Sequence, residues 1–80
     1  MSAAQNVTLR QLRAFVAVAE TGGFAPAARV LHLTPSALSL LIKEIENTLN
    51  VRMFDRTTRT TTLSRAGEEF YPLARKLLDD

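Results

Sequence analysis

The stretch FAPAARVLHLTPSALSLLIKEIENTL, residues 24–49, decides the fold of this chain. Its first part predicts a short helix over residues 24–31, because Pro26 falls in the first turn, where its missing N–H is not needed. Two residues later a second start signal follows, with Thr34 as the cap and Pro35 at the first helical position. Two helices joined by so short a turn form a helix-turn-helix.

The longer of the two helices, predicted from residue 35 to about 48, has two contrasting faces. Asn50 follows it as a left-handed stop. Apolar residues at spacings of three and four form a face that should be buried. They are Leu38, Leu41, Ile42, Ile45 and Leu49. The opposite face carries Ser36, Ser39, Leu40, Lys43 and Asn47.

Another helix precedes this motif. The capping box of Thr8 and Gln11, together with the glycine pair at residues 22 and 23, predicts a helix over residues 9–20. Its apolar residues recur at spacings of three and four, so they form one stripe that should be buried. They are Leu9, Leu12, Phe15, Val16 and Ala19.

A hairpin and a last helix follow the motif. Runs that favour β-structure, residues 51–54 and 60–63, predict a two-stranded hairpin with a basic loop, and Ser64 then caps a helix. The predicted fold is mainly α: a winged helix-turn-helix with three helices, a two-stranded wing and a long C-terminal linker helix. The expected divisions are an N-terminal tail at residues 1–8, the winged helix-turn-helix at 9–63 and the linker helix at 64–80.

Composition limits the chemistry. The 80 residues allow a single domain, and they include no cysteine and one histidine. No glycine-rich phosphate loop and no acid pair placed to share a cleft are found, so we expect no enzyme, no metal and no cofactor. The longest apolar run, residues 14–19, is far shorter than the ~18 residues that a bilayer requires, so we expect no membrane span.

The charges are unevenly placed. Residues 1–65 hold eight Arg or Lys and four Asp or Glu, a balance of +4, whereas residues 66–80 have a balance of −2. A basic body favours a polyanionic partner such as nucleic acid, although an ordinary solvated surface has the same charge.

The sequence resembles the N-terminal domain of LysR-type bacterial transcriptional regulators from residue 9 to about residue 78. The resemblance depends on residue types spread over the whole motif, the wing and the start of the last helix. They are Ala27, Ala28, Leu31, Thr34, Ala37, Leu38, Ser39, Ile42, Glu46, Leu49, Phe54, Arg56, Arg59, Leu63, Ser64, Arg65, Ala66 and Gly67.

The resemblance implies a sequence-specific domain that binds double-stranded DNA as a homodimer in the bacterial cytoplasm. The helix at about 35–48 would enter the major groove, and the wing at about 51–63 would meet the backbone or the minor groove. It also implies an interrupted palindromic site with A/T-rich half-sites. The parent chain would be longer, with a C-terminal domain, absent from these residues, that senses a small-molecule inducer. A helical interaction module that never touches DNA is the alternative function.

The expected DNA contacts lie on the longer helix and in the wing. They are Thr34, Pro35, Ser36, Ser39, Leu40, Lys43, Arg56 and Arg59. Pro35 and Leu40 depart from the family, which often carries glutamine at the first position and a polar or basic residue at the second. Alternative interpretations remain: the serines and Lys43 could be solvated, Arg56 could form an ion pair with Asp55, Glu44 or Glu46, and Arg59 could be an ordinary loop charge.

The last helix has an apolar stripe with steps of four, three and four residues. It consists of Ala66, Phe70, Leu73 and Leu77. A helix that projects from so small a body usually needs a partner, so the stripe predicts dimerisation, although it could also pack entirely on its own domain.

Overall fold

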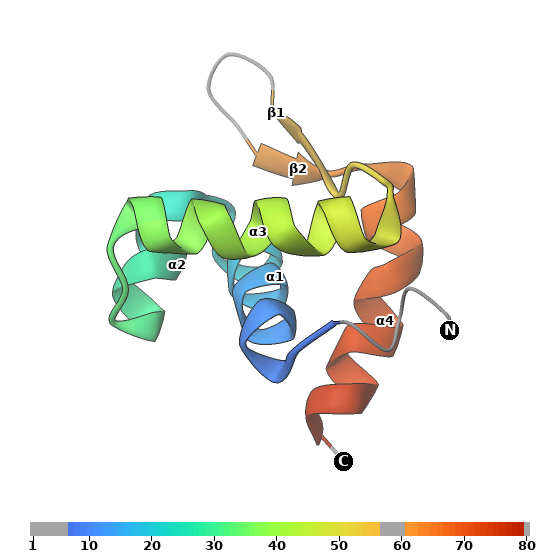
Figure 1. The fold of residues 1–80 in the computed structure, drawn as a ribbon, viewed down its shortest axis with the longest axis horizontal. Coiled ribbons are helices and arrows are strands. Elements are labelled where there is room, and N and C mark those ends of the chain that lie inside the picture. The colour runs from blue at the N-terminus through green and yellow to red at the C-terminus, as the bar shows by residue number, and fades with distance from the viewer. Residues whose placement is uncertain (1–6, 57–60, 80) are drawn as a thin grey trace.

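The computed structural model describes residues 7–56 and 61–79 and shows a winged helix-turn-helix, as predicted. In chain order the elements are α1 (Leu9–Thr21), α2 (Phe24–Leu31), α3 (Pro35–Leu49), β1 (Phe54–Arg56), β2 (Thr61–Leu63) and α4 (Arg65–Asp79). In Figure 1, α3 crosses over α1, the hairpin projects on the far side of α3 from α1, and α4 runs along one end of the molecule. Helix α1 contacts α2, α3 and α4, so it is the centre of the fold.

The predicted capping box of α1 is present. Thr8 Oγ1 accepts a hydrogen bond from the backbone N–H of Gln11, and Gln11 Oε1 accepts one from the N–H of Thr8, both at 3.1 Å. The helix ends one residue later than predicted, at Thr21, where Gly22 adopts a left-handed conformation with φ of 82°. A side chain at this φ would be strained, so glycine defines the end of the helix.

Phe15 lies at the centre of the core and has no exposed surface. Its ring centroid lies 5.4 Å from that of Phe54 in β1 and 5.3 Å from that of Phe70 in α4. The ring of Tyr71 lies 6.5 Å away. The Phe15 side chain of α1 therefore packs against both the wing and the linker helix.

Leu9 does not belong to this core, although the spacing of apolar residues predicts that it is buried. It is 55% exposed, because the first turn of α1 extends beyond the aromatic cluster. The remainder of the predicted stripe is buried or partly buried, as expected.

The first strand of the wing begins at Phe54, three residues later than predicted. Two backbone N–H groups of the preceding residues bond to Glu46 of α3 instead of to the second strand. The N–H of Val51 donates to the carbonyl of Glu46 at 3.1 Å, and the N–H of Met53 donates to Glu46 Oε2 at 2.8 Å. In the hairpin, Phe54 pairs with Leu63 in antiparallel register.

Ser64 joins the start of α4 to the root of the wing. Its Oγ accepts a hydrogen bond from the N–H of Gly67 at 3.0 Å and donates one to the carbonyl of Arg52 at 2.5 Å. Its own N–H donates to the carbonyl of Met53 at 2.9 Å. A Cβ at Gly67 would lie 2.2 Å from that Met53 carbonyl oxygen, so the close approach of α4 requires glycine.

A polar group also ties α4 to the end of α1. The hydroxyl of Tyr71 donates to Glu20 Oε2 at 2.6 Å, and Arg75 lies 3.6 Å from the same carboxylate oxygen. The hydrogen bond to Glu20 stabilises the neutral phenol and is the main reason that the pKa of Tyr71 is raised; burial and the charge of Glu20 act in the same direction. These contacts fix how α4 lies against α1.

Within the described ranges 7–56 and 61–79, no single helix is long and apolar enough to cross a membrane. By length and composition alone, α2 and α3 would pass that test as a pair, with a bend of 103° between them.

Candidate nucleic-acid interface

The turn between α2 and α3 sets the two helices at 103°, within the range of helix-turn-helix motifs. His32 ends α2 in a left-handed conformation with φ of 58°, so it lies in the turn. The N–H of Leu33 then donates to the carbonyl of Ala28 at 2.9 Å, which closes the turn. Ala27 and Ala28 are buried, and their small side chains let the helices approach closely.

The start of α3 is exposed and rich in hydrogen-bonding groups. Thr34 is the cap, and its Oγ1 accepts a hydrogen bond from the N–H of Ala37 at 3.1 Å. The hydroxyl proton of Thr34 is left to donate to a partner. Pro35 and Ser36 are exposed beside it. Because the N-terminal end of a helix is positive, this end of α3 favours an anion.

The two faces of α3 differ as the sequence predicts. Leu38, Ile42 and Ile45 have no exposed surface. On the outer face, Ser39, Lys43 and Asn47 are exposed with Leu40, which is 56% exposed. Six of the predicted contact residues therefore lie on the cap and exposed surface of one helix. They are Thr34, Pro35, Ser36, Ser39, Leu40 and Lys43.

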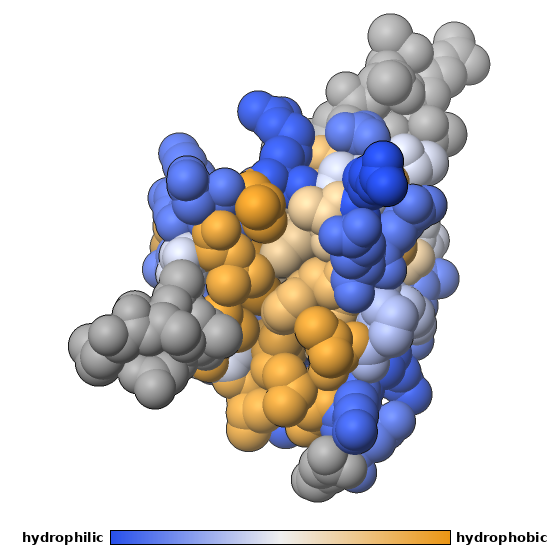
Figure 2. All heavy atoms as spheres, turned by 90° about the vertical axis from the view of Figure 1, so that its right-hand side faces the viewer, coloured by the Kyte–Doolittle hydropathy of each residue, from blue (hydrophilic) through white to orange (hydrophobic). Residues whose placement is uncertain are grey.

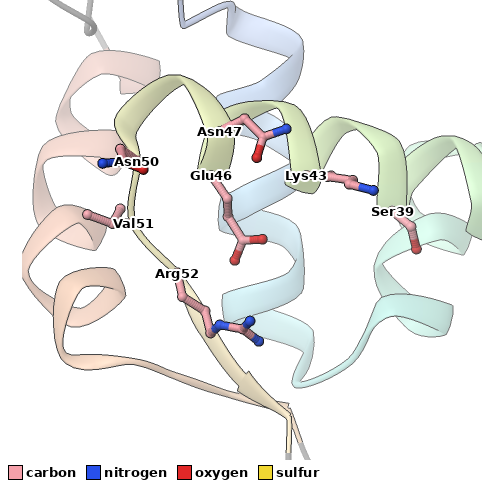
Figure 3. A pocket seen from close by; sticks show the side chains of 7 residues that line it. All are labelled: Ser39, Lys43, Glu46, Asn47, Asn50, Val51 and Arg52. Carbon is pink, nitrogen blue, oxygen red and sulfur yellow. The ribbon is translucent and has the colours of Figure 1, made fainter.

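A polar hollow of about 520 Å³ lies between α3 and the connection to the wing. Its lining comes from α3 and the three residues that follow it. The lining residues are Ser39, Lys43, Glu46, Asn47, Asn50, Val51 and Arg52. Figure 3 shows Glu46 pointing from α3 into this space while the Arg52 side chain extends beneath the helix. The hollow places Arg52 beside Ser39 and Lys43, a position that is not expected for a residue of the predicted strand at 51–54.

The structure describes one of the two arginines predicted to contact DNA from the wing. Arg56 is the last residue of β1, where its Cα pairs with that of Thr61. Arg59, the other predicted wing contact, lies outside the described residues. Of the proposed acidic partners of Arg56, Glu46 binds the N–H of Met53 at 2.8 Å, so it has a structural role of its own.

An apolar surface lies at the other end of the molecule, on α1 and α4. Figure 2 shows it as a continuous apolar area on the α4 side. Leu73 and Leu77 are 57% and 55% exposed. A hollow of about 290 Å³ separates the helices here. It is lined by Val7, Leu9, Leu12, Phe70 and Leu77.

The predicted dimerisation stripe is thus divided. Leu73 and Leu77 are more than half exposed, whereas Phe70 is partly buried and packs edge-on against Phe15. Ala66 is partly buried, and Ala74, which is not in the stripe, is fully buried. The exposed part of the stripe continues onto α1 through Leu9, which the sequence had placed in the core.

Comparison with known proteins gives the family. Residues 9–68 match the family model described as bacterial regulatory helix-turn-helix protein, lysR family. The chain belongs to this family.

Curated LysR-family relatives are transcriptional regulators. The regulator PerR of Escherichia coli K12 is 53% identical over 60 residues, which cover 75% of this chain and 20% of PerR. The uncharacterized regulator YbhD of the same strain is 44% identical over 70 residues, which cover 88% of this chain and 22% of YbhD. The chain thus spans about a fifth of the length of these two relatives.

Solved structures of the family have the same fold. Oxidized OxyR of Corynebacterium glutamicum is 38% identical with a TM-score of 0.89, over 92% of this chain and 23% of OxyR. The BenM DNA-binding domain in complex with benA site 1 DNA is 38% identical with a TM-score of 0.86. That match covers 90% of this chain and 81% of the BenM domain.

Proposed function

We propose that this LysR-family chain is the sequence-specific, double-stranded-DNA-binding part of a bacterial transcriptional regulator. Helix α3 lies in the major groove, and the wing, residues 51–63, lies on the backbone or in the neighbouring minor groove. The observation that carries this proposal is the division of α3, whose inner side chains are fully buried while its cap and outer face stay exposed.

The contacts divide by chemistry. Base edges are read by Ser39 and Leu40, and the cap residues Thr34, Pro35 and Ser36 hold the helix start against the phosphates. Lys43, Arg56 and Arg59 bind phosphates. We assign the domain no enzymatic activity, no metal and no cofactor.

The apolar surface of α4 and α1 supports a homodimer. Leu73 and Leu77 are more than half exposed on a short chain, which is unfavourable unless a second copy covers them. A two-fold dimer binds two half-sites, so we propose a palindromic site. That the palindrome is interrupted and its half-sites are A/T-rich is what the resemblance to the family implies. We further propose residues 9–63 as the DNA-binding unit and residues 64–80 as the linker helix. The complete regulator acts in the cytoplasm, and a domain outside these residues binds its small-molecule inducer.

Duplex binding as a function of salt tests the proposed function. The isolated chain should bind duplexes at low salt, and the logarithm of its affinity should fall linearly with the logarithm of salt concentration. Fluorescence anisotropy with a duplex from the parent gene's own upstream region and with a scrambled duplex measures both affinity and preference. Absence of binding at low salt would favour the interaction-module alternative.

Leu40 is expected to read a thymine methyl group. It is 56% exposed on the outer face of α3, and a methyl group is the base-edge feature that an aliphatic side chain can contact in the major groove. Leu40→Ala should reduce discrimination at one A·T position per half-site by about 1 kcal/mol, with little change in nonspecific affinity. Competition binding with cognate and substituted duplexes measures this.

Uracil at the same position removes only the methyl group, so it isolates the contact. Wild-type protein should bind the uracil duplex more weakly than the thymine duplex, and Leu40→Ala should bind both equally. Val30→Ala is the matched control, because Val30 is an exposed apolar residue on α2. Equal wild-type affinity for the two duplexes would exclude the contact.

A further inference from the structure

We propose that the hollow between α3 and the root of the wing holds the sugar-phosphate strand that separates the two DNA grooves, with Lys43 and Arg52 as its phosphate ligands. The inference rests on the proposed function and extends it to a residue, Arg52, that is not among the individual contacts predicted from the sequence.

The position of the hollow supports this assignment. If α3 lies in a major groove and the wing meets the neighbouring minor groove, the strand between the grooves passes between α3 and the wing. The hollow lies there, bounded by α3 on one side and by residues 50–52 on the other. The hollow, about 520 Å³ in volume, reaches the outer face of α3, because Ser39 and Lys43 are part of its lining.

The lining suits a phosphate. Lys43 and Arg52 contribute two positive charges against the one negative charge of Glu46, so the hollow has a balance of +1. One oxygen of Glu46 is already engaged by the N–H of Met53 at 2.8 Å. Ser39 and Asn47 add neutral donors. The guanidinium of Arg52 can bind two phosphate oxygens at once.

The backbone of Arg52 is held in place although its side chain is exposed. Its carbonyl accepts a hydrogen bond from Ser64 Oγ at 2.5 Å. The residues on both sides are bonded to Glu46, Val51 through the backbone carbonyl at 3.1 Å and Met53 through the side chain. The backbone that carries the Arg52 side chain is therefore fixed beside α3, so less conformational entropy is lost when the guanidinium binds DNA.

Charge-removing variants test the assignment. Arg52→Ala and Lys43→Ala should each weaken binding to cognate and scrambled duplexes by a similar factor, about fivefold or more at moderate salt, and lower the salt slope by about one unit per protomer. Lys76→Ala is the matched control, because it removes an exposed charge from α4, away from the hollow. Circular dichroism checks that every variant keeps the wild-type helix content.

Neutral methylphosphonate linkages locate the contact. Each phosphate between the half-site and the flanking minor groove is replaced in turn, and binding of the wild-type and Arg52→Ala chains is measured. One position should weaken wild-type binding and leave Arg52→Ala almost unaffected, because that variant no longer contacts the phosphate.

The outcomes separate this inference from the proposed function. If the wild-type chain binds DNA and Arg52→Ala behaves like Lys76→Ala, the assignment of the hollow is wrong and DNA binding by α3 stands. If the wild-type chain binds no duplex, the proposed function itself fails. Saturable binding of inorganic phosphate at Lys43 and Arg52, seen by NMR without DNA and unaffected by added duplex, would instead identify a small-anion site and overturn the assignment.

Discussion

Replacing Phe15 with alanine is expected to remove about 3–5 kcal/mol of the free energy of unfolding, the usual loss for a buried phenylalanine. The effect should be near the upper end, because three aromatic rings from other elements pack around Phe15 at centroid distances of 5.3–6.5 Å. A domain of this size has roughly 4–12 kcal/mol of stability in all. The melting temperature, followed by circular dichroism, should fall by more than about 12 °C.

Val30→Ala is the control for this experiment. Val30 is 61% exposed, so its truncation should change the free energy of unfolding by no more than about 0.5 kcal/mol. Equal stabilities for the two variants would mean that the aromatic cluster does not organise the core.

Placing acids on the exposed part of α4 should have the largest effect on DNA binding. Leu73→Glu combined with Leu77→Glu puts two charges where a second copy is proposed to pack, so the chain should sediment as a monomer. Binding to a two-half-site duplex should then weaken by at least about 100-fold, because linked binding of two half-sites is lost. Affinity for a duplex with a single half-site should stay within about twofold of the wild type, since α3 is unchanged.

Lys76→Glu serves as the matched control. It introduces an acid into the same region of α4 at an exposed polar position, and it should leave the dimer intact. If the double variant still sediments as a dimer, Leu73 and Leu77 do not form the interface, and the two copies must meet through another surface.

The helices could be predicted from the sequence because local signals determine their ends. Thr8 with Gln11 starts α1, and Thr34 with Pro35 starts α3, each through contacts within three residues. Asn50 ends α3 in the left-handed conformation, as predicted, with φ of 55°.

The start of the wing could not be predicted, because it depends on a side chain seven residues earlier. Glu46 binds the N–H of Met53, and this delays the first strand until Phe54. Sequence patterns of β-favouring residues carry no signal of such a contact. Because the pattern predicts a strand over residues 51–54, it does not indicate that Arg52 lies beside α3.

Helical spacing also did not determine whether the apolar stripe on α4 packs within the protomer or against a second copy. Spacing shows which residues share a face, but not what covers that face. Phe70 meets Phe15 of its own protomer, whereas Leu73 and Leu77 do not enter the core. Leu9 joins the exposed surface because α4 ends beside the first turn of α1, a long-range arrangement that the local stripe in α1 does not reveal.

The hydrogen bonds of Ser64 connect the linker helix directly to the start of the wing. Ser64 is hydrogen-bonded to the carbonyls of Arg52 and Met53 before the wing and to the N–H of Gly67 in α4, and a Cβ at Gly67 would clash with the Met53 carbonyl oxygen. A rotation of α4 about its axis would therefore pull directly on residues 52 and 53, where the wing begins.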